Sequence, residues 1–134
     1  MNTIYTKAKE KLLTGQINWL SDTIKVALVD SAAYTPNPST DEFLAGITSG
    51  AIVATSDPLA GKSATQGIAD ADDLTIAGVT GSQFEYLVIY KDTGSASTSP
   101  LICLIDTATN LPFTPTGGSL TLQFDNGSSK IFSL

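Results

Sequence analysis

The chain has 134 residues, and its seven lysines against thirteen acidic residues give a formal net charge of −6. It contains neither arginine nor histidine, so it lacks the forked side chain that grips phosphate and the most common metal ligand and general base. This composition argues against nucleic-acid binding and the usual forms of catalysis, and we predict neither enzyme activity nor a cofactor.

The length is typical of a single domain, expected over residues 1–134, with a buried core. The longest apolar run is too short to cross a bilayer, and lysines interrupt the N-terminal segment where a secretory signal needs apolar residues. We therefore expect no membrane association. Only 15% of residues are charged, so Ser, Thr, Gly and Ala must cover much of the surface. Such a surface is typical of a β-protein packed against neighbours, or of an ordinary soluble β-sandwich.

The one helical pattern covers residues 3–14, within a predicted helical region of residues 1–15. Asn2 or Thr3 is the expected N-cap, and Gly15 is the expected terminating residue. The apolar stripe is formed by Ile4, Ala8 and Leu12, with Tyr5 and Leu13 beside it, and the opposite side carries Lys7, Lys9, Glu10 and Lys11. The lysines have two interpretations: a docking surface for an acidic partner, or the solvated side of a helix that covers one end of a sheet.

Residues 16–134 show the period-two alternation of a β-protein. Two strands that are apolar on both faces, residues 84–91 and 101–106, are expected at the centre of a sheet covered on both sides. Asn126 and Gly127 predict a hairpin that returns the chain through the last residues. The other predicted strands are residues 23–30, 51–55, 73–77 and 119–125. About seven or eight strands thus predict a mainly β fold, an antiparallel β-sandwich or partly closed barrel with one N-terminal α-helix.

Residues that carry chemistry in other proteins have structural interpretations in this sequence. Cys103 is the single cysteine, lies in the middle of a predicted strand and is expected to be a small buried residue. Trp19 is expected to anchor the helix to the sheet. The aspartates in residues 70–73 lack the glycine and closing glutamate of a calcium loop, and we interpret them as a polar turn. Asp41 and Glu42 are adjacent and are expected to point apart in a helical turn.

Three irregular segments carry five of the six prolines of the chain. They are residues 32–41 with Pro36 and Pro38, residues 57–73 with Pro58 and Lys62, and residues 111–118 with Pro112 and Pro115. Long segments without regular structure are usually functional or mobile, so these three are the predicted contact loops.

Five stretches give the chain a resemblance to a known family over nearly its full length. They are NTIYTKAKEKLLTG, SDTIKVALVDSAAYT, GKSATQGIADADDLTI, YLVIYKDTGSASTSPLICLIDTATNLP and LQFDNGSSKIFSL. The chain resembles small virion proteins of tailed bacteriophages. The resemblance implies a structural protein of the capsid decoration, or cement, type, located on the capsid surface after assembly in the host cytoplasm.

For such a protein, the expected partner is the major capsid protein, and a homo-oligomer (dimer or trimer) is expected. The predicted partner-contact residues are Lys7, Lys9, Lys11, Tyr34, Pro36, Pro38, Pro58, Lys62, Pro112 and Pro115. Two alternatives stay open. One is a tail or head–tail connector protein of the same broad class. The other is a receptor- or carbohydrate-binding module, which needs exposed aromatic residues and for which Tyr34 and Trp19 are the only loop candidates.

Overall fold

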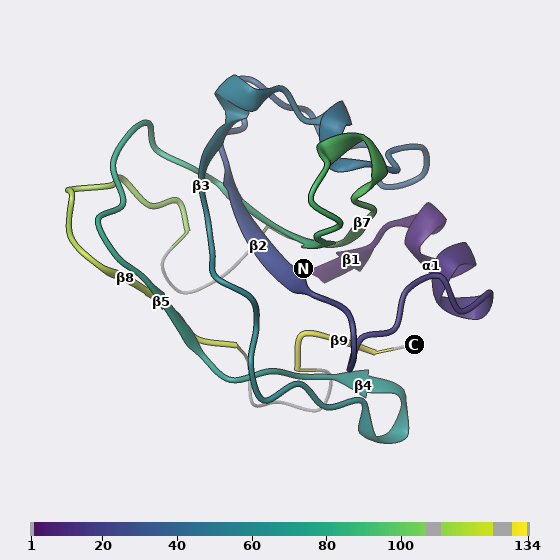
Figure 1. Ribbon diagram of the computed structural model, residues 1–134. Helices are drawn as coiled ribbons and strands as arrows, with labels where there is room; N and C mark the ends of the chain where they lie inside the picture. Colours follow the sequence, from purple (N-terminus) through teal and green to yellow (C-terminus); the bar gives the residue numbers. More distant parts are fainter. Residues whose placement is uncertain (1, 107–110, 125–129, 134) are drawn as a thin grey trace.

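The computed structural model describes residues 2–106, 111–124 and 130–133. In this part of the chain, nine strands and one α-helix, α1 (Thr6–Leu13), form a mainly β, sandwich-like fold (Figure 1). The main sheet is antiparallel and has five strands, in the spatial order β1 (Asn2–Ile4), β7 (Leu101–Ile105), β6 (Tyr86–Lys91), β2 (Ile24–Val29) and β3 (Ile52–Thr55). The predicted fold class, with its single N-terminal helix, is confirmed.

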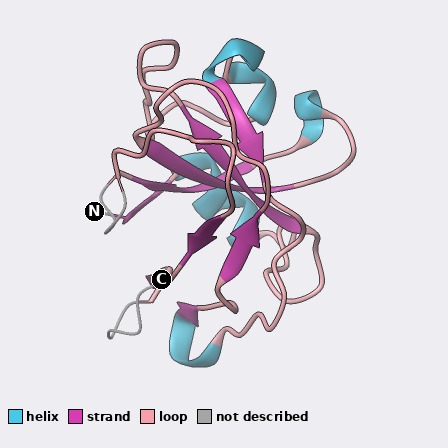
Figure 2. Ribbon diagram, turned by 90° about the vertical axis from the view of Figure 1, so that its left-hand side faces the viewer, coloured by secondary structure: helices cyan, strands magenta, loops and turns pink. Residues whose placement is uncertain are grey.

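Two short antiparallel pairs complete the β structure. They are β4 (Ile68–Ala69) with β9 (Phe132–Ser133), and β5 (Leu74–Ile76) with β8 (Leu120–Leu122). The described part of the chain also has four 3-10 turns: η1 (Leu44–Gly46), η2 (Ser49–Ala51), η3 (Thr65–Gly67) and η4 (Ala96–Thr98). Figures 1 and 2 place η1, η2 and η4 at one end of the molecule and β4 with η3 at the other.

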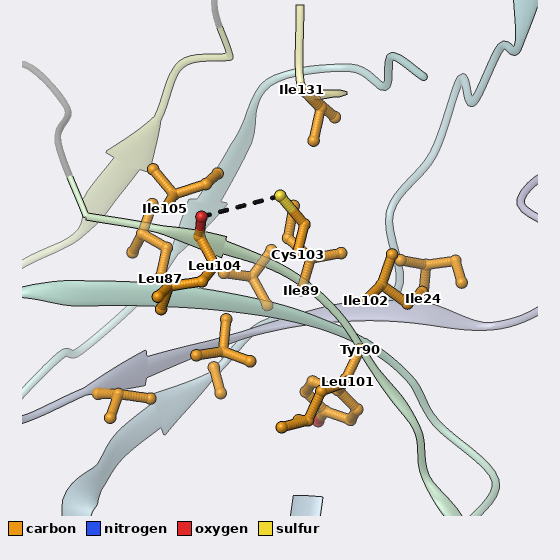
Figure 3. Close-up of a cluster of buried hydrophobic side chains, with 14 of the residues drawn as sticks. Ile24, Leu87, Ile89, Tyr90, Leu101, Ile102, Cys103, Leu104, Ile105 and Ile131 are labelled. Carbon is orange, nitrogen blue, oxygen red and sulfur yellow. Dashed lines mark hydrogen bonds between the residues drawn. The ribbon is translucent and has the colours of Figure 1, made fainter. Parts of the chain in front are cut away.

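The centre of the main sheet is apolar on both faces, as predicted. All five residues of β7 and the inner four of β6 are buried. The strand register aligns Val26 of β2 with Ile89 of β6 and Cys103 of β7, so these side chains share one face. Figure 3 shows Ile131 pointing toward Cys103 on that face, with Tyr90 and Leu101 on the opposite side. Burying such a strand pair on both sides is the main apolar contribution to stability.

Both edges of the main sheet are blunted. At the β1 edge, the Asn2 side-chain amide donates to the Ile131 carbonyl oxygen at 2.5 Å. At the β3 edge, Leu28 pairs with Ala54 and Val29 pairs with Ile52, which leaves Val53 as an extra, bulged residue. Short, bulged or covered edges resist pairing with other chains, so neither edge offers a long open strand.

The predicted start of the helix is wrong. Asn2–Ile4 is extended and pairs with β7, and the helix begins at Thr6. Neither Asn2 nor Thr3 is the cap. Tyr5 precedes the helix without a side-chain cap, and the Thr6 N–H donates to the Pro38 carbonyl oxygen at 2.9 Å. The physical reason is that the outer edge of β7 needs a hydrogen-bonding partner, and a strand supplies it where a helical turn cannot.

The end of the helix is partly as predicted. Gly15 has a φ of +76°, and the Gln16 N–H reaches back to the Lys11 carbonyl oxygen at 2.9 Å, which closes the helix in the expected manner. Ala8 is fully buried, whereas Leu13 is 88% exposed and does not belong to the apolar stripe.

The predicted C-terminal hairpin is wrong in its strand pairing, because β8 pairs with β5 and β9 pairs with β4. The last strands therefore run antiparallel to residues 68–76 as one interrupted ribbon. In this ribbon, four residues separate β4 from β5, and nine residues separate β8 from β9. The Asn126–Gly127 turn falls outside the described residues.

The doubly covered sheet predicts a sharp contrast between two aliphatic positions. We expect Ile102→Ala to lower the free energy of unfolding by about 2–5 kcal/mol, because Ile102 is fully buried in β7 and leaves a cavity. The matched control Leu13→Ala removes an exposed side chain and should change that free energy by less than about 0.5 kcal/mol. Urea unfolding followed by circular dichroism measures both, and equal losses would contradict the assignment of β7 to the core.

Candidate functional site

The proline-bearing segment after β2 is fixed to the start of the helix rather than free. Tyr34 is buried, and its hydroxyl donates to Asp41 Oδ2 at 2.6 Å while lying 3.1 Å from the Tyr5 hydroxyl. The Asn37 N–H also donates to Asp41 Oδ2, at 2.8 Å. Together with the Thr6–Pro38 hydrogen bond, these contacts hold the segment against β1 and α1.

The next residues continue along the start of β7. The Leu101 N–H donates to the Glu42 carbonyl oxygen at 2.8 Å, and the Leu44 N–H donates to the Ser99 carbonyl oxygen at 2.8 Å. Lys11 of α1 reaches this strip and forms an ion pair with Glu42 at 2.5 Å. Backbone and side-chain contacts therefore lock residues 42–44 between α1 and β7.

A surface hollow of about 410 Å³ opens between these segments, and we call it the end hollow. Its lining includes the buried residues Tyr34 and Leu101, the half-buried residues Asp41, Glu42 and Phe43, and small exposed residues of η1 and η4. Because Leu101 lies on the opposite face of the sheet from Cys103, the end hollow belongs to the face that Ile131 does not cover (Figure 3). The end hollow has a lining of mixed polarity that includes two acidic residues.

The ionisable groups at this site favour binding over proton transfer. The hydrogen bond from Lys11 lowers the pKa of Glu42 below its ordinary value, which keeps the carboxylate charged. Burial, and next the hydrogen bond to Asp41, raise the pKa of Tyr34 far above its usual range, so this hydroxyl stays a neutral donor. In β7, burial raises the pKa of the Cys103 thiol to about 12, which suits an inert core residue.

Two further searches of the described residues concern a metal site and a membrane span. In residues 2–106, 111–124 and 130–133, no group of three or more Cys, Asp or Glu side chains is placed to hold a metal ion. Within the same ranges, no helix has the length and apolar character needed to span a bilayer.

The predicted helix lysines differ in their availability. Lys7 pairs with Glu10 at 3.3 Å, and Lys11 is committed to Glu42 with its ammonium 5.1 Å from the centre of the Phe43 ring. Lys9 is exposed and has no partner among the described residues. Of the three lysines, Lys9 is the one that forms no ion pair with a described residue.

The predicted loop residues are spread over the molecule. Pro36 and Pro38 are half-buried in the segment that borders the end hollow. Pro58 is exposed, and Lys62 donates to the Asp22 carbonyl oxygen, with its pKa lowered by burial. Pro112, which is exposed, and Pro115, which is half-buried, lie in the segment that precedes β8. These residues do not form one continuous site.

Both aromatic candidates for glycan recognition are buried. Tyr34 is 8% exposed and belongs to the buried core, and it is also among the residues that line the end hollow. Trp19 is 5% exposed, donates from Nε1 to the Asp70 carbonyl oxygen at 3.2 Å and packs edge-on against Phe132 at 5.3 Å. Trp19 thus anchors the chain after α1 to the β4–β9 pair, and neither ring is presented for stacking on a sugar.

Asp41 and Glu42 were expected in a helical turn, but they precede it, and both belong to the lining of the end hollow. Their carboxylates have different partners: Asp41 accepts from Tyr34 and Asn37, and Glu42 pairs with Lys11. The helical turn η1 begins only at Leu44, and Phe43 before it is extended, with φ −119° and ψ 155°. The sequence does contain a feature that could have indicated this site. Two acidic residues and an aromatic residue, Asp41, Glu42 and Phe43, follow the two prolines in succession.

Comparison of the chain with protein-family models and with curated proteins finds no match. The functional proposal therefore depends on the site geometry and on the resemblance of the sequence stretches quoted above.

The tyrosine network supports a first prediction for the site. We expect Tyr34→Phe to lower the free energy of unfolding by about 1–3 kcal/mol, because it leaves the buried Tyr5 hydroxyl and Asp41 without their shared partner. The control Tyr86→Phe removes a half-buried hydroxyl that makes no hydrogen bond within the described residues, and should have little effect. Thermal and urea unfolding of both variants test this. An unchanged free energy of unfolding in Tyr34→Phe would contradict the conclusion that these hydrogen bonds hold the proline-bearing segment in place.

The lowered pKa of Glu42 gives a second prediction. The Lys11 contact stabilises the fold above the ordinary glutamate pKa of 4.5, and this stabilisation is lost as the pH falls through the lowered folded pKa. Carbon-13 NMR titration should place the Glu42 midpoint below 4.5, and Lys11→Met should raise it. Lys9→Met removes an equal charge from the same helix and should leave the midpoint nearly unchanged. An unmoved midpoint in Lys11→Met would refute the pairing.

Proposed function

We propose that this chain is a structural protein of a tailed-phage virion that binds the assembled capsid and stabilises it, as a decoration or cement protein without catalysis. The observation that carries the proposal is the fixed surface at the end of the main sheet. There, irregular segments are held by backbone hydrogen bonds to α1 and β7 instead of moving freely. A contact surface that is already ordered loses little conformational entropy on binding, which suits a protein whose task is adhesion.

The sequence resemblance supports the same proposal, since the quoted stretches include the helix, the central strands and the loop between β6 and β7. That loop is itself stiff. Thr93, Thr98 and Ser99 form a network of hydroxyl contacts, with Thr93 Oγ1 2.5 Å from Thr98 Oγ1 and 3.2 Å from Ser99 Oγ. Its contact with η1 extends the fixed surface beside the end hollow.

The proposed partner is the major capsid protein, on the outer surface of the shell, with the chain present as a dimer or trimer. The experiment is mass spectrometry and electron cryomicroscopy of purified particles from cells that produce this protein. We expect many copies of the β fold on the capsid surface, and particles without the protein to open at lower temperature. Absence from the particles would refute a virion role. Density confined to the tail or the connector would refute the capsid location.

A further inference from the structure

We propose that the end hollow is a binding site for a basic side chain, a lysine or an arginine, carried by the partner protein. This inference deepens the proposed function, on which the identity of the partner rests, by naming the chemistry of one contact. The hollow is defined chiefly by Asp41, the last residue of the predicted contact loop 32–41, and by Glu42 and Phe43 directly after it.

The lining matches the two parts of a basic side chain. The half-buried ring of Phe43, with the exposed Ala45 and the small exposed part of Tyr34, gives an apolar surface for an aliphatic stem. Lysine and arginine characteristically lay their methylene groups on such surfaces while the charged head reaches a polar group. The small residues of η1 and η4 at the opening, including Gly46 and Ser97, leave room for the side chain to enter.

The charge balance selects a cation. Glu42 is neutralised by Lys11 at 2.5 Å. Asp41 Oδ2 accepts hydrogen bonds only from neutral donors, the Tyr34 hydroxyl and the Asn37 N–H, and in the described part of the chain no lysine pairs with Asp41. The hollow therefore carries one uncompensated negative charge, which attracts a cationic head and repels an anion.

The carboxylate is also held in place before any ligand arrives. Two hydrogen bonds of 2.6 and 2.8 Å fix Asp41 Oδ2, and the segment behind it is tied to α1 through Pro38. A preorganised carboxylate needs little rearrangement on binding, so the contact adds affinity at small entropic cost.

The first experiment uses the full chain and three small probes. Nitrogen-15 NMR titrations with n-butylguanidinium and n-butylammonium should give saturable shifts at the amides of residues 41–46 and 97, with affinities on the order of millimolar. Shifts with only one of the two cations would support the proposal and name arginine or lysine as the side chain. The neutral isostere n-butylurea should bind about tenfold more weakly, because it lacks the charge. Equal binding of n-butylurea, or shifts located elsewhere, would overturn the proposal.

Three variants sharpen the test. Asp41→Asn keeps an oxygen that accepts from Tyr34 and Asn37 but removes the charge, and should weaken cation binding about tenfold. Asp57→Asn makes the same charge change at an exposed carboxylate outside the lining and should leave binding unchanged. Gly46→Leu narrows the opening at a position where a Cβ meets no atom within 4 Å, so it should fold and bind less. Equal effects of Asp41→Asn and Asp57→Asn, or unaltered binding by Gly46→Leu, would refute the site.

A binding assay on particles separates this inference from the proposed function. Particles produced without the chain are mixed with the wild-type protein, Asp41→Asn and Asp57→Asn, and the bound protein is measured after sedimentation. Reduced binding by Asp41→Asn alone supports the contact. Equal binding by all three would refute the hollow as the contact while leaving the proposed function standing. Failure of the wild-type protein to bind would refute the proposed function, and the probe titrations would still decide the cation site.

Discussion

The rest of the molecule depends on a single constraint, which is that β6 and β7 are apolar on both faces and both faces must be covered. A single five-stranded sheet cannot bury both of its own faces, so irregular segments of the chain pack against each face. On one face, Ile131 from the C-terminal segment points toward Cys103 (Figure 3). On the other, the proline-bearing segment contributes the buried Tyr34, and the chain directly after it accepts a hydrogen bond from the buried Leu101 at the Glu42 carbonyl oxygen. The large share of irregular structure therefore follows from a sheet with few strands and two hydrophobic faces.

This constraint also determines where a contact surface forms. The end hollow has the first residue of β7 in its lining, so it is a place where the covering layer over the core is incomplete. The contacts that order Glu42 attach the layer to α1 and β7. Tyr34, which donates to Asp41, also contacts the Tyr5 hydroxyl directly before α1. Folding and preorganisation of the site are thus one process, and a substitution that loosens the layer should affect stability and binding together.

Local sequence patterns were sufficient for the parts of the fold that alternate cleanly. The strands β2, β6, β7 and β8 were predicted from their periodicity, and Gly15 from its position after the helix. The errors have non-local causes. Asn2–Ile4 fits a helical stripe equally well, and only its pairing with β7 makes it a strand. The C-terminal strands pair with β5 and β4 across about 44 to 65 residues, which no turn motif could indicate. Asp41 and Glu42 lie before the helical turn because Phe43 is extended, a backbone detail that composition does not show.

The distribution of charge in this chain favours a basic contact surface on the partner over an acidic one. Among the described residues, five lysines form ion pairs within the chain, and Lys62 donates to a main-chain oxygen. The lysines thus hold loops and strand ends in place. For example, Lys25 of β2 pairs with Asp92, directly after β6, at 2.7 Å. Carboxylates outside these pairs, including Asp41 and Asp57, outnumber the single free Lys9. The surface left for a partner is therefore acidic, and attraction toward a basic patch follows from the same pairing that holds the irregular segments in place.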